Sequence, residues 1–134
     1  MGRSVFFALA MVVCAVQVAS GQPGSSGAQP GVNVAQTLET MKGDLRRLVG
    51  ANQVYFADNG RFSADVSTLR GYHPSPGVTV NIVQASSTGW AAEATAATVP
   101  GKSCVISVGS VPHAPTTLAD KRSGPEAVAV CDSP

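Results

Sequence analysis

Apolar residues recur every three or four positions between residues 34 and 58, which is the period of an amphipathic helix. The stripe, which includes one amide, consists of Val34, Leu38, Met41, Leu45, Leu48, Val49, Asn52, Tyr55 and Phe56. The opposite face carries Glu39, Lys42, Arg46, Arg47 and Gln53. Asn33 is a suitable N-cap, and Gly60 can take the left-handed conformation that ends many helices. The pattern therefore predicts one long helix over residues 34–58.

The residues after Gly60 predict a return of the chain to the core. Phe62 is expected to pack against Tyr55 or Phe56 at the end of the helix. Ser63 is a suitable cap, so we expect a short helical turn over residues 64–69. The Gly- and Pro-rich residues 71–77 then predict a loop.

Beyond this loop the apolar positions alternate, which predicts strands at residues 78–83, 90–96 and 104–108. Runs of this kind joined by short turns form antiparallel hairpins. The second strand presents Ala92, Ala94 and Ala96 on one face, where a helix can approach closely. A short edge strand is expected at residues 128–131. The pattern predicts an α+β fold: a long N-terminal amphipathic helix packed on a 3–4-stranded antiparallel sheet.

The first 21 residues have the layout of a secretory signal peptide. Arg3 gives a positive start, an apolar run covers residues 5–16, and small residues lead to Gly21. A membrane anchor is the alternative, but Gln17 interrupts the run before it reaches the roughly 20 apolar residues of a spanning helix. A lipid on Cys14 is a weaker alternative, because the preceding residues match a lipoprotein signal poorly.

We therefore expect three segments: a signal peptide at residues 1–21, a flexible Gly/Pro/Ser linker at residues 22–32, and a globular domain at residues 33–134. The product would be exported to the periplasm or the medium. It would have no stable membrane insertion after cleavage.

Two cysteines, Cys104 and Cys131, remain once the signal peptide is removed. An even number of cysteines in an exported chain predicts a structural disulfide, which would bound a C-terminal loop. The chain-entropy model assigns such a bridge about 3–4 kcal/mol. A redox pair or a metal site is the alternative, but neither cysteine lies in a CxxC motif or near a histidine at ligand spacing. We expect no metal and no cofactor.

The charge of the mature chain excludes one class of partner. The sequence holds nine Lys and Arg residues and eight Asp and Glu residues, so loss of Arg3 leaves eight of each sign. Nucleic acids are bound mainly through a basic surface. A neutral domain is therefore not expected to bind nucleic acid.

Several short motifs along residues 34–131 resemble those of type IV pilin-like proteins, the minor pilins and the pseudopilins of type II secretion. The first is QVYFADNGRF, from Gln53 to Phe62. It is followed by PSPGVTV at residues 74–80, by Gly89-Trp90, by GKSC at residues 101–104 and by the closing Cys131. The resemblance implies a helical spine across an antiparallel sheet, a disulfide-bounded C-terminal region and assembly into surface or periplasmic filaments.

The start of the chain departs from that family. Pilins are cut after a Gly that precedes Phe, and the apolar helix that follows the cut is retained as a membrane anchor. Here Gly21 and Gly24 precede Gln and Ser, and the apolar run lies in the segment expected to be removed. The chain is therefore expected to lack the usual prepilin leader and retained transmembrane helix.

Gly43 and Gly50 lie on the outward face of the predicted helix, seven positions apart. Each costs about 1 kcal/mol relative to Ala in a helix interior. Either the helix tolerates them, which we favour, or another chain approaches its backbone at these positions.

We expect an exported, non-catalytic, pilin-like structural or interaction domain, accessory to a surface filament or secretion system. Its partners would be other pilin-like subunits or a surface or periplasmic protein. The contacts are expected at the outward helix face and at the loop over residues 112–126, where His113, Lys121 and Arg122 are the polar side chains.

Two alternatives remain. A periplasmic small-ligand or protein-binding module is the first, although the chain has only one Trp, two Tyr and four Phe to line a pocket. An enzyme is the second. No GxSxG motif occurs, and neither His73 nor His113 lies in a nucleophile or metal motif, so we expect no catalytic residues.

Overall fold

The computed structural model describes residues 33–134. Its elements, in chain order, are α1 (Val34–Asn59), the 3-10 turn η1 (Val66–Thr68), β1 (Val78–Ala85), β2 (Gly89–Ala96), β3 (Ser103–Gly109) and β4 (Val130–Cys131). The four strands form one antiparallel sheet in the order β1-β2-β3-β4. The predicted α+β fold is confirmed. The signal peptide and the linker predicted at residues 1–21 and 22–32 lie outside the described residues.

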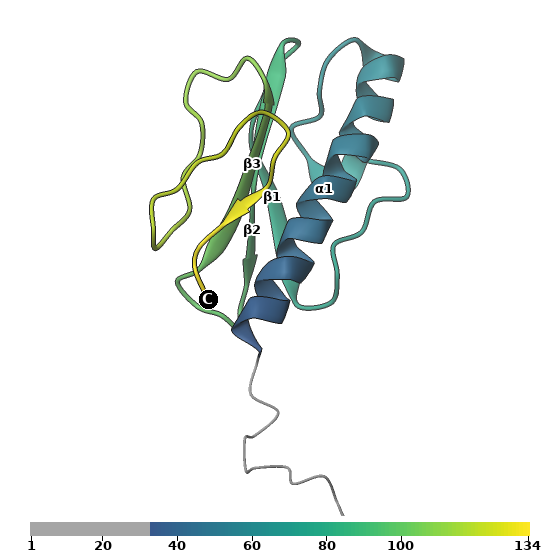
Figure 1. Cartoon of the computed structure of the whole chain (residues 1–134). Coiled ribbons are helices and arrows are strands. Elements are labelled where there is room, and N and C mark those ends of the chain that lie inside the picture. The colour runs from purple at the N-terminus through teal and green to yellow at the C-terminus, as the bar shows by residue number, and fades with distance from the viewer. Residues whose placement is uncertain (1–32) are drawn as a thin grey trace, which may run out of the picture.

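The sheet has a different cover on each face (Figure 1). α1 lies along one face, and the segment that joins β3 to β4 lies on the opposite side. Within residues 33–134, no helix combines the length and the apolar character needed to cross a bilayer.

The caps predicted from the sequence set both ends of α1. The side chain of Asn33 accepts a hydrogen bond from the Gln36 N–H at 3.1 Å. Gly60 follows the helix with a φ of 69°, a left-handed conformation in which a side chain would be strained. The helix therefore runs one residue further than expected, to Asn59.

The end of α1 is held by an aromatic pair and by an amide. The rings of Phe56 and Phe62 lie with their centroids 4.5 Å apart, as predicted. Asn52 is fully buried, and its side-chain oxygen accepts the Ser63 N–H at 2.8 Å. The amide in the apolar stripe thus fixes the direction of the chain after the helix.

The prediction that Ser63 caps a turn over residues 64–69 is wrong. The 3-10 turn covers only Val66–Thr68, and its cap is Asp65, whose side chain accepts the Ser67 N–H at 2.8 Å. The Ser63 hydroxyl instead accepts the Asp65 N–H at 3.0 Å. This bond forms a separate turn that precedes the 3-10 turn.

The core lies between α1 and the sheet. Ala92, Ala94 and Ala96 of β2 are buried on the helix side, and Trp90 is buried near the start of the same strand. The alanines leave room for the larger side chains of α1, among which Met41, Leu45 and Leu48 have no exposed surface. The short β2 side chains therefore account for the close approach of helix and sheet.

Candidate functional site

The loop predicted as an interaction site is bounded by the disulfide. Cys104 of β3 and Cys131 of β4 lie directly opposite each other in the sheet and are bonded, as predicted. The bridge joins the short last strand to the body of the sheet. Disulfides of this kind persist in oxidising compartments, which is consistent with an exported chain.

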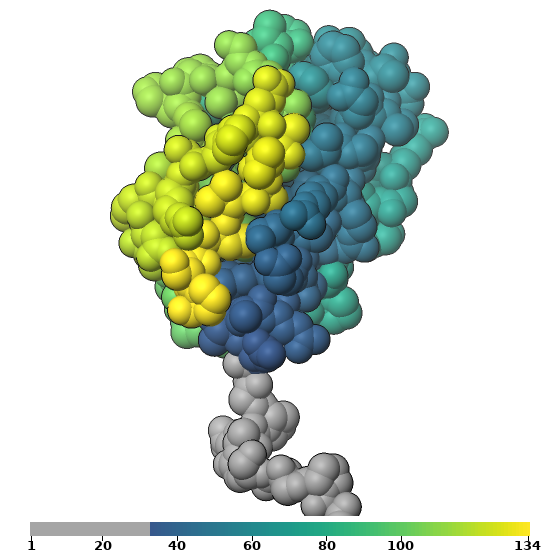
Figure 2. All heavy atoms as spheres, viewed as in Figure 1, coloured from purple at the N-terminus to yellow at the C-terminus, as the bar shows by residue number. Residues whose placement is uncertain are grey.

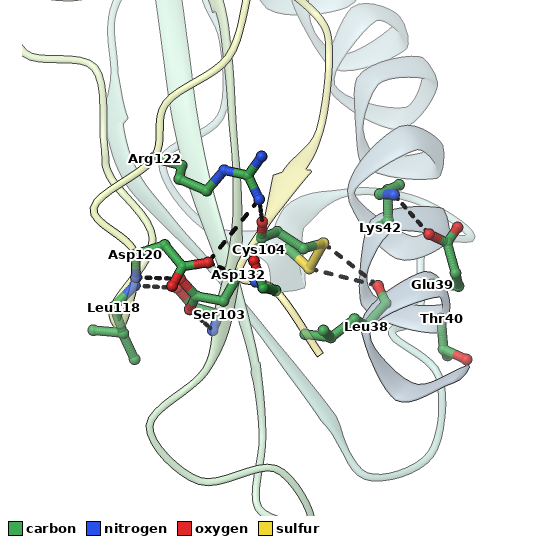
Figure 3. The surroundings of a disulfide bond; sticks show 12 residues. Leu38, Glu39, Thr40, Lys42, Ser103, Cys104, Leu118, Asp120, Arg122 and Asp132 are labelled. Atoms are coloured by element: carbon green, nitrogen blue, oxygen red, sulfur yellow. Dashed lines mark hydrogen bonds and ion pairs between the residues drawn. A yellow bond between two sulfur atoms is a disulfide. The ribbon is translucent and has the colours of Figure 1, made fainter. Parts of the chain in front are cut away.

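Strand alternation sends the side chains around the disulfide to two different faces. The two sulfurs point toward α1, where each lies 3.5 Å from the carbonyl oxygen of Leu38 (Figure 3). A bonded sulfur carries no hydrogen, so these approaches are packing contacts. The next residues, Ser103 and Asp132, point the other way, toward the loop (Figure 3).

Asp132 is a buried carboxylate at the centre of this loop. Its oxygens accept hydrogen bonds from the backbone N–H groups of Ser103 at 2.8 Å, Asp120 at 2.7 Å and Ala119 at 3.2 Å. Burial favours the neutral form, but these bonds and one from the Thr117 side chain outweigh it and lower the pKa of Asp132 to about 2. The charged carboxylate therefore ties the loop to the sheet.

Further bonds close the turn next to Asp132. The Thr117 N–H donates to the Arg122 carbonyl oxygen at 2.9 Å, and the Arg122 N–H donates to the Thr117 hydroxyl at 3.0 Å. The Asp120 side chain accepts the Ser133 N–H at 2.6 Å, which lowers the pKa of Asp120. Lys121, at the tip, is exposed and has a left-handed φ of 54°.

The other end of the loop is tied to β1. The Gln84 side chain donates to the carbonyl oxygen of His113 at 2.6 Å, whereas Arg122 donates to the carbonyl oxygen of Cys131 in β4 at 3.5 Å. β1 and β4 are the two edge strands of the sheet, and three interstrand spacings, about 14 Å in all, separate them. The structure therefore does not bring His113 together with Arg122, and the three predicted polar side chains do not form one cluster.

A groove brings the two expected interaction surfaces together. A cavity of about 360 Å³ lies between the first turns of α1 and β4, and is lined by Glu39 and Lys42 of the helix and by Arg122 of the loop. Figure 2 shows the C-terminal segment, in yellow, lying against the blue N-terminal part of α1. Lys42 is paired with Glu39 at 2.6 Å. The outward helix face and the loop are thus parts of one continuous surface.

Asp44 is a structural residue that our sequence analysis missed. It is buried within α1 and accepts hydrogen bonds from the Ser75 N–H at 2.9 Å and from the Ser75 hydroxyl at 2.8 Å, and it pairs with Arg47. The Tyr72 hydroxyl donates to the Asp44 carbonyl oxygen at 3.0 Å. The sequence pattern does indicate that Asp44 is buried, because position 44 lies three residues after Met41, inside the apolar stripe.

The two histidines of the described residues lie in separate loops. The hydrogen bonds within residues 33–134 include none from the imidazoles of His73 and His113. Within the same residues, no three His, Cys, Asp or Glu side chains are placed to hold a metal ion. The hydrogen bonds to Asp132, by contrast, hold the loop in place.

No protein-family model matches this chain, and no curated protein matches it significantly. The likeness to pilin-like proteins therefore remains a prediction from the motifs in the sequence.

Proposed function

We propose that this chain is an exported, non-catalytic interaction domain of pilin-like architecture. It would act as an accessory to a surface filament or a secretion system, with another pilin-like subunit or a surface protein as its partner. The alternative, a periplasmic module that binds a small ligand or a protein, differs in the partner and not in the scaffold.

The observation that carries the proposal is the disulfide-bracketed loop on the face of the sheet opposite α1 (Figure 1). The resemblance implies a helical spine, an antiparallel sheet and a disulfide-bounded C-terminal region, and the domain has all three parts in that chain order. The stretch from Gln53 to Phe62 supports it further, since it forms the helix end, the cap and the aromatic contact.

The groove between α1 and β4 is the surface that we assign to a protein partner. It combines side chains of both signs, since Glu39 lies beside Lys42 and Arg122 lines the same groove. Mixed charge at the rim of an interface contributes to the choice of partner more than to affinity.

Fractionation of the expressing cells tests the proposal. The cell surface is sheared, and the sheared, periplasmic and membrane fractions are probed for the chain before and after chemical crosslinking. We expect the chain outside the cytoplasm, crosslinked to one partner, and we expect Arg122→Glu to weaken that crosslink. Arg61→Glu is the matched control, because Arg61 is exposed and lies outside the groove. A chain found only in the cytoplasm would overturn the proposal.

A further inference from the structure

A cavity lined by basic side chains lies beside α1, away from the loop. It has a volume of about 280 Å³, and its lining includes Arg47 and Ala51 from the helix and Arg70, Tyr72 and His73 from the connection between α1 and β1. No acidic side chain lines this cavity. A cleft with cationic walls concentrates anions.

The connection holds Arg70 at the surface because it is anchored on either side of that residue. Leu69 and Tyr72 are buried in the core, whereas Arg70 and His73 are exposed. Gly71 lies between the anchors with a φ of 70°, a conformation that favours glycine. The Tyr72 hydroxyl bonds to α1, and burial together with the Asp44 charge raises the pKa of Tyr72 to about 12. The tyrosine is therefore a neutral wall of the cavity.

Arg47 is held in position by Asp44 and Ser75. One nitrogen of its guanidinium bonds to the buried carboxylate of Asp44 and lies 3.3 Å from the Ser75 hydroxyl. The other guanidinium nitrogens of Arg47 make no hydrogen bond within residues 33–134. Arg70 forms neither an ion pair nor a side-chain hydrogen bond with any described residue. Both arginines thus have donors available for a ligand.

The charge balance selects the kind of anion. Around the basic cavity, the positive charges of Arg47 and Arg70 are offset by the negative charge of Asp44, so the two arginines and the carboxylate together carry one net positive charge. A single positive charge complements a monoanion better than a doubly charged phosphate. Arginine also binds planar carboxylates through two parallel hydrogen bonds.

A second cavity shares part of its lining with the first and offers apolar surface beside polar groups. Its volume is about 250 Å³, and it shares Ala51 and Arg70 with the basic cavity. Asp58, Asn59 and Thr68 form the polar part of its lining, and the carboxylate of Asp58 disfavours a second negative charge on the ligand. Val54 and Tyr55 form the apolar part, and Val54 is 61% exposed. An apolar chain attached to the anion would cover this surface and remove it from water.

We propose that the two cavities together bind a monocarboxylate with an apolar side group. The carboxylate lies between Arg47 and Arg70, and the apolar group lies along Val54 and Tyr55. Two sources share this chemistry: a free carboxylic acid and the C-terminal residue of a partner peptide. The inference is independent of the pilin-like proposal, because it depends only on the groups that line the cavities.

Titration followed by NMR tests the proposal on the isotope-labelled chain, purified with its disulfide formed. The probes are hexanoate and its uncharged amide, and N-acetyl-glycyl-leucine and its C-terminal amide. We expect the acids to shift the amide signals of Ala51, Gly71 and His73 saturably at millimolar concentration, and the amides to leave them unchanged. Tighter binding of the peptide acid would assign the site to a peptide terminus, and tighter binding of hexanoate would assign it to a free acid.

Two variants distinguish a specific binding site from general attraction between charges. Arg70→Ala is expected to weaken binding of the acids by about tenfold or more, because a charge-assisted hydrogen bond is lost. Arg46→Ala is the matched control, since Arg46 is exposed on the same helix and does not line either cavity. Equal loss of binding in both variants would overturn the proposal. Equal binding of the acids and their amides, or no saturable shift, would overturn it as well.

Discussion

The two faces of the sheet are covered by different means. On one face, α1 contributes a stripe of large apolar side chains to a hydrophobic core with the alanines of β2. On the other, the segment between β3 and β4 is fastened by a disulfide, a buried carboxylate and a few hydrogen bonds from side chains to backbone. The first cover is stabilised by the area that it buries, and the second by cross-links at particular points.

The difference matters for how each face responds to change. Burial is shared among many contacts, so the helix face loses stability in proportion to the apolar volume that is removed. A loop held at a few points loses a large part of its order when one point is removed. The disulfide is where the two systems meet, because its sulfurs contact α1 while its neighbours Ser103 and Asp132 bind the loop (Figure 3).

Leu45→Ala is expected to have the largest effect on the helix face. Leu45 has no exposed surface, and its truncation leaves a cavity between α1 and the sheet. The free energy of unfolding should fall by about 3 kcal/mol, measured by urea denaturation. Val54→Ala, on the exposed side of the same helix, should change it by less than about 0.5 kcal/mol. Equal effects of the two substitutions would contradict the core described here.

Among changes on the loop face, removal of the disulfide should cause the largest loss of stability. The double variant Cys104→Ala and Cys131→Ala, which buries no unpartnered hydroxyl, should lose about 2–4 kcal/mol of stability. A reductant should lower the melting temperature of the original chain toward that of the variant, and should leave the variant unchanged. A variant that melts at the original temperature would show that the bridge is not structural.

Asp132 should make the stability of the loop face sensitive to acid. Its folded pKa of about 2 is below the ordinary value of 3.8, so its contribution is complete above pH 4 and is lost as the pH falls toward 2. Asp132→Asn should cost about 2 kcal/mol at neutral pH, because an amide N–H₂ then faces backbone donors. Denaturation curves between pH 2 and 7 should be flatter in this variant. An unchanged acid dependence would assign the sensitivity to other carboxylates.

Gly50→Ala is expected to give the smallest effect, and a stabilising one. A Cβ at Gly50 meets no atom within 4 Å, so alanine fits and helix propensity favours it by about 1 kcal/mol. Gly60→Ala is the contrasting control, since the positive φ of Gly60 makes alanine unfavourable there. If Gly50→Ala is stabilising but also weakens crosslinking to the partner, this helix face takes part in the interface.

The sequence predicted the helix face well and the loop face poorly. Periodicity located α1 and the strands to within a residue or two, because burial on one side imposes a repeat that can be counted. Asp44 escaped notice because its partner, Ser75, lies in a loop far along the chain. Asp132 was missed for the same reason, since its partners come from β3 and from residues 119–120.

Hydrogen exchange on the variant without the disulfide tests most directly whether the two covers are independent. We predict that the amides of Leu118 and Asp120, which are bonded to Ser103 and Asp132, lose their protection, while those of Leu45 and Leu48 in α1 keep most of theirs. If the amides of α1 and of the loop lose protection together and to the same extent, the two faces form one cooperative unit, which would contradict this account.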